Sequence, residues 1–210
     1  MAGLQLSDEE QSERLKEWWK ENGTSVITGA VLGIAVIGGV NYWRSHKAHQ
    51  AEAASALYTQ LVQDAGQSGT ADVGQQLMDD YDGTPYAGKA ALILAKTAFE
   101  NGDMDGAKRR LEWAVNNASD PEDRKLATLR LARVELDMNE PDKAQSLLSG
   151  MQAGGYESEY RELLGDLAMT RNDAAGARKE YQAALDALPD RSGFGDALNM
   201  KLDAALGASQ

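Results

Sequence analysis

The sequence predicts an all-α protein in which one membrane-spanning helix precedes a stack of paired helices. Three observations lead to this prediction. An uncharged run lies between Glu21 and Arg44, no segment alternates apolar and polar residues as a β-strand does, and turn signals recur about every 34 residues in the rest of the chain. A chain of 210 residues has room for one domain beside such a helix. We therefore expect a single helical core outside the membrane.

The composition excludes several classes of function. The formal net charge of −12 would repel a phosphate backbone unless a basic stripe were present, and the sequence has none, so we expect no nucleic-acid partner. Cysteine is absent, which excludes disulfides, thiolate metal sites and a cysteine nucleophile. The mean hydropathy of −0.49 is that of a soluble protein and conceals the uncharged run.

Residues 24–43 form the predicted membrane helix. At about 1.5 Å of rise per residue, this run matches the roughly 30 Å of hydrocarbon in a bilayer. Trp18 and Trp19 precede it, and Tyr42 and Trp43 end it, where the aromatic belts of membrane proteins are found. A buried core helix is disfavoured because the run is uninterrupted and contains four glycines.

A cleaved secretory signal is the other explanation for an apolar run near the N-terminus. Such signals have a short basic lead and an apolar stretch of about 7–15 residues, whereas residues 1–23 carry six acids and three bases and the run is longer. We therefore expect an uncleaved anchor. The positive-inside rule favours a cytoplasmic N-terminus only slightly. The bases near the span are Arg14, Lys16 and Lys20 before it and Arg44 and Lys47 after it.

The leader, residues 1–23, is predicted to be an amphipathic helix at the membrane interface. A capping box of Ser7 and Glu10 begins it, and the following apolar residues Leu15 and Trp18 share one face with Trp19. This helix either docks a partner or only locates the span.

Gly29 and Gly33 form a pattern of small residues within the span. Such spacing lets two membrane helices touch, although glycine is also simply tolerated in membrane helices. The contact, if made, is with a second copy or with another protein's helix.

The last repeat carries the spacing of a tetratricopeptide motif. Gly165 is followed by Ala177, Tyr181, Ala184 and Pro189 at the intervals of that motif. The small residues let two antiparallel helices approach closely, and Tyr181 fills the groove between this pair and the next. Pro189 is expected to stop the second helix.

Earlier parts of the chain keep this register at shifts of 33 and 37 residues. We therefore expect tetratricopeptide repeats over 85–189, membrane-proximal helices with a degenerate repeat over 44–84, and a capping helix and tail over 190–210. The equivalent positions are Ala95, Ala107, Leu111 and Ala114, then Ala132, Ala144, Leu148 and Met151. The coinciding turn pairs are Gly102-Asp103, Asn139-Glu140 and Asn172-Asp173.

The stretch "GTPYAGKA", residues 83–90, resembles a phosphate-binding loop but lacks two of its requirements. Ala90 stands where a Ser or Thr hydroxyl holds Mg²⁺, and the preceding residues are helical, not a strand. We expect Thr84 to cap the next helix and Pro85 to occupy its first turn. Nucleotide binding is therefore not expected.

No catalytic, cofactor or metal site is predicted. The stretch "DMDG" at Asp103 begins like a calcium loop, but its twelfth residue is Ala114 and not a glutamate. His46 and His49 share a helical face without a nearby carboxylate, so we expect them to be solvated at the membrane surface. No Ser-His-Asp set can be assembled, and we expect no enzyme.

A binding surface follows from the repeat register, because the first helices of stacked pairs line the concave side of a solenoid. We expect an apolar trough with a basic and an acidic end, which binds a polypeptide segment and orients it by charge. Alternatively, some of its leucines belong only to the core. The predicted groove residues are Lys89, Leu92, Lys96, Phe99, Leu126, Leu129, Arg133, Leu136, Glu159, Glu162, Asp166 and Met169.

Several stretches occur in a specific order. An acidic leader ends in "EWWKENG", and "VLGIAVIGGVNYWRSH", "ALILAK", "LRLARV", "GDLAMTRNDAAGARKEYQAAL" and "NMKLD" follow. On these stretches, and over nearly its whole length, the chain resembles the YfgM family, the ancillary subunit of the bacterial SecYEG translocon. One departure is Thr24, where the family often has a base, so orientation rests more on the resemblance.

The resemblance implies a single-pass protein of the bacterial inner membrane, with its N-terminus in the cytoplasm and its repeats in the periplasm. It further implies association with the translocon and with a membrane-anchored periplasmic chaperone of the PpiD type. The function would be to hold or hand over newly translocated, unfolded secretory chains, with the chaperone or such a chain in the trough. The family has no catalytic motif.

Two other functions stay open. A structural scaffold would dimerise through Gly29 and Gly33 and organise envelope complexes. A regulatory adaptor would be recognised by a cytoplasmic partner through its leader.

Overall fold

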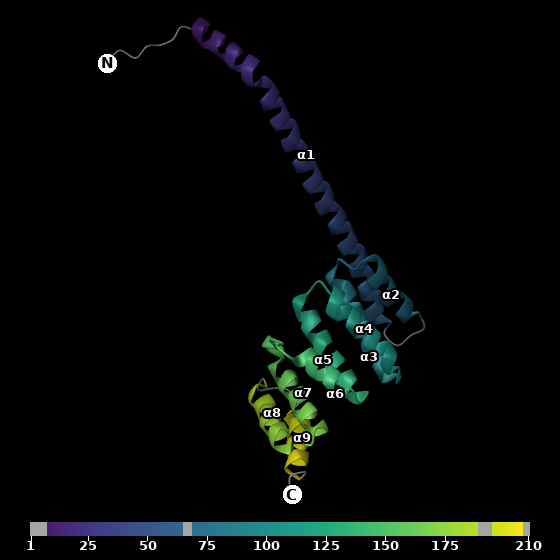
Figure 1. Ribbon diagram of the computed structural model, residues 1–210. Helices are drawn as coiled ribbons and strands as arrows, with labels where there is room; N and C mark the ends of the chain where they lie inside the picture. Colours follow the sequence, from purple (N-terminus) through teal and green to yellow (C-terminus); the bar gives the residue numbers. More distant parts are fainter. Residues whose placement is uncertain (1–7, 65–68, 189–194, 208–210) are drawn as a thin grey trace, which may run out of the picture. The chain divides into compact units, whose positions relative to one another are not determined.

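A computed structural model describes residues 8–64, 69–188 and 195–207 of the chain (Figure 1). The chain divides into two units, Met1–Gln50 and Ala51–Gln210. Every regular element within the described residues is a helix, which confirms the all-α class.

The first unit holds most of helix α1, Asp8–Gln63. This helix runs without interruption through the predicted leader and span, so the predicted limits at residues 23 and 43 fall inside one element. Ser7 of the predicted capping box lies outside the described residues. The apolar side chains of residues 24–43 are exposed, as in Ile34 at 71%, so this segment of α1 is no core helix. Its length and hydropathy suffice to cross a membrane.

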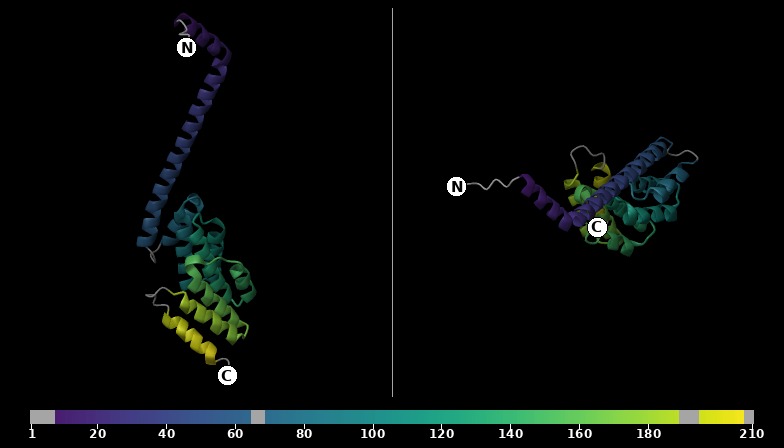
Figure 2. Two further views of the ribbon diagram at one scale, coloured as in Figure 1. Left: turned by 90° about the vertical axis from the view of Figure 1, so that its left-hand side faces the viewer. Right: turned by 90° about the horizontal axis from the view of Figure 1, so that it is seen from above.

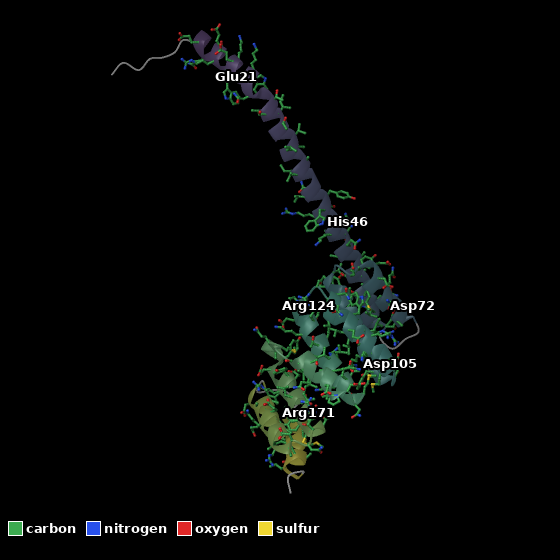
Figure 3. The ribbon with its side chains drawn as sticks, in the orientation of Figure 1. Glu21, His46, Asp72, Asp105, Arg124 and Arg171 are labelled. Carbon is green, nitrogen blue, oxygen red and sulfur yellow. The ribbon has the colours of Figure 1, made fainter. Side chains whose placement is uncertain are left out.

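Aromatic side chains flank the apolar segment of α1. The ring centroids of Trp18 and Trp19 lie 6.4 Å apart at one end. At the other end, Lys47 Nζ lies 4.3 Å from the centroid of the Trp43 ring. Tyr42 stacks on His46, whose side chain projects from α1 (Figure 3). Aromatic rings beside a cation are typical of a membrane–water boundary.

The second unit begins with the last turns of α1 and with α2, Thr70–Asp80. Ala54 and Leu61 of α1 are fully buried in its first core cluster, together with Leu77 of α2. The Tyr58 ring lies 5.4 Å from that of Tyr86. These two helices occupy the place where the sequence predicts a degenerate repeat.

Three helix pairs follow, and each packs against the next along the chain (Figure 2). A 3-10 turn, Gly154–Tyr156, precedes the third pair, and α9 packs on its second helix. The elements are α3 (Pro85–Glu100) with α4 (Met104–Asn117), α5 (Pro121–Asp137) with α6 (Pro141–Leu148), α7 (Glu157–Thr170) with α8 (Ala174–Asp186), and α9 (Gly195–Gly207).

The turn inside each pair is the same. Its first residue has a positive φ, and the N–H of the next residue bonds to the carbonyl five residues earlier, which is a Schellman ending. The φ values are 78° at Gly102, 60° at Asn139 and 60° at Asn172. The bonds run from Asp103 to Ala98, from Glu140 to Glu135 and from Asp173 to Ala168, at 2.9, 2.8 and 2.9 Å. These bonds define the repeat register directly.

The small residues of the repeat pattern lie where the helices approach most closely. Every alanine of the three pairs that the pattern singles out is at most 2% exposed. At Gly165, an added Cβ would overlap the ring of Tyr181, which is itself only 3% exposed. The third pair therefore depends on a glycine to seat its aromatic residue.

Two positions differ from the prediction. Met151 lies outside a helix because α6 ends at Leu148, so it is only half-buried. Thr84 does occupy the N-cap position before Pro85, but its side chain accepts no cap bond. Its hydroxyl donates to the Tyr81 carbonyl at 2.7 Å. Pro189 lies outside the described residues.

Candidate partner-binding surface

α3 and α5 bring three of the predicted groove residues together around a pocket of about 210 Å³, here named the α3–α5 pocket. Lys96 and Phe99 come from α3, and Arg133 comes from α5. Phe99 is 37% exposed, although a side chain of this type is normally buried. An exposed aromatic ring beside an open pocket is typical of a contact surface.

The floor of the α3–α5 pocket is apolar. Ala95, Leu111 and Val134 form it, and each is at most 3% exposed. Ala95 and Leu111 are repeat-defining positions of the first pair, so the repeat pattern itself builds this floor. A preformed apolar floor can receive an apolar side chain of a partner without rearrangement of the helices.

Arg130 also lines the α3–α5 pocket, although it is not among the predicted groove residues. The equivalent positions of the other two pairs hold Ile93 and Leu163, so a cation at this place breaks the apolar pattern. This exception to the apolar pattern is the sequence feature that distinguishes Arg130. Neighbouring side chains partly desolvate the guanidinium and lower the pKa of Arg130, although the residue remains exposed.

The three cations around the pocket are not fully compensated. Lys96 pairs only with Glu100 of the same helix, at 2.8 Å, and that pair is exposed. Arg133 donates to Glu162 through one nitrogen at 2.9 Å. Among the residues that the structure describes, no carboxylate forms an ion pair with Arg130. The pocket thus presents positive charge on a protein whose net charge is −12.

Leu92 and Leu129 do not line a groove, which corrects the expectation for both. They are 5% and 3% exposed and belong to the first and second core clusters. Leu126 and Leu136 are half-buried and pack on the same two clusters. The alternative assignment of the groove leucines to the core therefore holds for Leu92 and Leu129.

The first helices of the three pairs, α3, α5 and α7, are here called the first-helix row. At its other end, Lys201 of α9 pairs with two of the predicted acidic residues of α7. This α7–α9 end is closed by Lys201, whose Nζ lies 2.6 Å from Glu162 and 2.7 Å from Asp166. The Tyr181 hydroxyl also donates to Asp166, at 2.8 Å. Met169 packs on the third core cluster, to which α9 contributes. Two of the three predicted acidic residues, Glu162 and Asp166, are consequently paired within the molecule.

The pKa values at the α7–α9 end reflect this closure. Burial raises the pKa of Glu162, but the hydrogen bond from Lys201 and the charge of Arg133 outweigh it, so the pKa lies below its ordinary value. Burial, followed by the neighbouring Asp166, raises the pKa of Tyr181, which stays a neutral donor.

The remaining predicted groove residues lie apart from the pocket. Lys89 holds Asp123 at 2.8 Å, and this hydrogen bond raises the pKa of Lys89. Ala90 is fully buried next to Lys89, and residues 85–90 of the stretch that resembles a phosphate-binding loop belong to α3. Glu159 is half-buried on α7. Among the described residues, no cluster of three acidic or histidine side chains could hold a metal ion.

Gly29 and Gly33 lie on the exposed surface of α1. A Cβ added at either position would meet no atom within 4 Å. The small-residue face is therefore open in the described unit.

The chain is similar to known proteins along nearly its entire length. A tetratricopeptide repeat-like domain family matches residues 16–207. A protein of Haemophilus influenzae named "Ancillary SecYEG translocon subunit" is 30% identical over 181 residues, which cover 85% of this chain and 89% of that protein. The chain belongs to the family of ancillary SecYEG translocon subunits. A candidate membrane helix followed by a stack of tetratricopeptide pairs is thus the fold of this family member.

Other members of the family are also similar. The Escherichia coli K12 protein of the same name is 26% identical and covers 85% of this chain and 87% of its own length. The Neisseria gonorrhoeae protein is 26% identical over 204 residues, 94% of this chain and 97% of that protein. No solved structure matches the chain. Tetratricopeptide repeats stack into extended surfaces that bind other proteins.

Proposed function

We propose that the protein is a non-enzymatic adaptor at the Sec translocon of a bacterial inner membrane. The relatives that cover most of the chain carry the name of an ancillary translocon subunit. Helix α1 is long and apolar enough to anchor the protein. The anchor would hold the helix pairs close to the site where translocated chains emerge.

The proposed orientation places the N-terminus in the cytoplasm and the repeats in the periplasm. The basic residues on the two sides of the span favour this orientation only slightly, so most of its support comes from the family resemblance. The partners in the periplasm would be a membrane-anchored chaperone of the PpiD type and newly translocated, unfolded chains.

The observation that carries the binding role is the α3–α5 pocket, with its buried apolar floor and its cations. Phe99 offers an exposed ring, and Arg130 and Arg133 offer guanidinium groups that bind carboxylates. A polypeptide segment with an apolar side chain next to acidic residues has the matching chemistry. The net charge of −12 would repel such a segment at long range, so we expect the pocket to select by contact more than by attraction.

Photo-crosslinking in living cells tests this function. A photo-reactive amino acid replaces Phe99 or Arg130 in the full chain, and Met200 on α9, which is 73% exposed, serves as the control position. We expect Phe99 and Arg130 to give adducts with a periplasmic chaperone or with secretory chains, and Met200 to give few. Equal yields from all three positions would contradict a binding role for the pocket.

The same experiment separates the two alternatives. Adducts between two copies from Gly33, with none from Phe99, would favour the scaffold that dimerises in the membrane. Loss of the cellular phenotype on deletion of residues 1–20, with Phe99 adducts unchanged, would favour the regulatory adaptor. Protease that cleaves the bulk of the protein in inverted vesicles but not in spheroplasts would overturn the proposed orientation.

A further inference from the structure

A buried carboxylate on α5 lacks a partner for one of its oxygens. The side chain of Glu135 is only 4% exposed, and its Oε1 lies 2.7 Å from Lys108 Nζ of α4. Its Oε2 is buried and has no hydrogen-bond partner. A buried charge that is only half satisfied is costly, so it calls for an explanation.

The repeat fold does not require a carboxylate at this position. The Schellman bonds of the three pairs are accepted by the carbonyls of Ala98, Glu135 and Ala168, so these three residues occupy equivalent positions. The first and third pairs fill this place with alanine, which needs no partner. Replacing a buried ion pair by apolar residues is often neutral or stabilising, so packing alone does not account for Glu135.

Glu135 lines a cleft of about 600 Å³ between α4, α5 and α6, here named the α4–α6 cleft. It shares no lining residue with the α3–α5 pocket, although α4 and α5 contribute to both. The lining combines acidic, amide and apolar side chains. They include Glu112, Val115, Asn116, Leu131, Asp142 and Leu147.

We propose that the α4–α6 cleft receives an arginine or lysine side chain of a partner polypeptide, with Glu135 Oε2 as the buried acceptor. Val115, Leu131 and Leu147 would pack on the methylene stem, because long cationic side chains bury their stems against apolar surface. A fully hydrated small cation makes no use of such a lining, which favours a polypeptide.

Lys108 is the cation that already pairs with the Glu135 carboxylate. It is 21% exposed and bonds only to Oε1, so it can swing outward while the incoming cation takes Oε2. The other lysine of the cleft, Lys143, pairs with Glu140 at 3.2 Å. At the rim, Asp142 pairs with Arg171 at 3.0 Å, an example within the chain of arginine bound at this edge. Glu112 remains to attract the partner's charge.

A pair of short peptides tests the proposal on the full chain in nanodiscs of zwitterionic phosphatidylcholine. One is acetyl-Leu-Arg-Leu-amide, and the other carries citrulline, a neutral isostere, in place of arginine. Calorimetric titration should show the arginine peptide binding at least about tenfold more tightly, since a charge-assisted hydrogen bond is roughly twice as strong as a neutral one. Equal binding of the two peptides overturns the proposal. Because both peptides are tested on the unmodified chain, this comparison does not depend on whether a variant folds.

Variants locate the site. Glu135→Gln should remove the preference for arginine, whereas Asp137→Asn, an exposed carboxylate of the same helix, should keep it. Lys108→Met should strengthen binding of the arginine peptide, because the competing cation is gone. Retention of the preference in a folded Glu135→Gln variant, or weaker binding in Lys108→Met, overturns the assignment of Glu135 as acceptor. Spermidine that binds as tightly as the peptide overturns the choice of a polypeptide.

Discussion

The two ends of the first-helix row use equivalent positions in opposite ways. At the α3–α5 pocket, Lys96 and Arg133 surround an exposed ring and an apolar floor. At the α7–α9 end, the equivalent residue is Asp166, and Lys201 of the capping helix holds it together with Glu162. The first end is open to a partner, and the second is closed by the chain's own side chains.

This difference shows that the repeat scaffold sets where side chains stand, whereas ion pairs between neighbouring helices set which of them remain accessible. Acidic residues exceed basic ones in the whole chain, yet cations line the α3–α5 pocket. Asp166 is paired with Lys201 at the other end, and Glu162 pairs both with Lys201 and with Arg133 of the pocket. The overall charge is thus a poor guide to the partner, and the local pairs are a better one.

Removing the aromatic anchor of the closed end should have the largest effect on stability. Tyr181→Ala deletes a ring that is 3% exposed and seated against Gly165, so we expect a loss of about 3–5 kcal/mol in the free energy of unfolding. Urea unfolding of the full chain in detergent measures it. Tyr181→Phe, which loses only the hydrogen bond to Asp166, should cost about 1 kcal/mol. Equal losses in both variants would contradict a packing role for the ring.

Lys201 at the closed end and Lys96 at the open end should differ clearly in their contribution to the free energy of unfolding. Lys201→Met leaves Glu162 and Asp166 half-buried without their main cation, so we expect a loss of about 1–3 kcal/mol in the free energy of unfolding. Lys96→Met removes only an exposed pair within one helix and should change it by less than about 0.5 kcal/mol. Thermal unfolding of both variants makes the comparison, and similar losses would mean that the two ends are not different.

The closed end should also be sensitive to acid. The pKa of Glu162 in the folded protein lies below its ordinary value of 4.5, so its ionised form contributes stability that is present above about pH 4.5 and is lost as the pH falls through the lower folded pKa. Glu162→Gln should therefore lose less stability than the unmodified protein between pH 5 and about pH 3. Identical acid profiles for Glu162→Gln and the unmodified protein argue against the closure.

The smallest effect on stability is expected at the open end. Arg130→Gln removes a cation with no ion pair among the described residues, so the free energy of unfolding should change by less than about 0.5 kcal/mol. Partner binding should nevertheless weaken about tenfold, because the partner's carboxylate loses a charged donor. If the Arg130→Gln variant is destabilised and its crosslinking to partners is unchanged, Arg130 stabilises the fold and does not bind the partner.

The sequence predicts the helix pairs well because a few spacing rules define them. Small residues such as Ala107 and Ala144, with turn residues such as Asn139, recur at fixed intervals, and each has one packing role. The exposed apolar run of α1 is likewise predictable from composition alone.

The binding surface was harder to predict for two physical reasons. Register gives the position of a residue along a helix but not its depth, so Leu92 and Leu129 look like groove residues and are core. Ion pairs between stacked helices also join residues far apart in sequence, such as Lys201 and Asp166, which are 35 positions apart. No local sequence pattern predicts these ion pairs. Arg130 and Glu135 break the repeat pattern, and such exceptions are the signal to look for.

The most direct test of the open and closed ends uses a reporter inside the α3–α5 pocket. In the full chain in nanodiscs, 4-fluorophenylalanine replaces Phe99, and its ¹⁹F resonance is followed during titration with two peptides. Both carry a central phenylalanine, which is flanked by glutamates in one and by lysines in the other. The account predicts that the glutamate peptide shifts the resonance at a concentration about tenfold lower. A lysine peptide that acts equally well or better, as the net charge of −12 alone would favour, contradicts it.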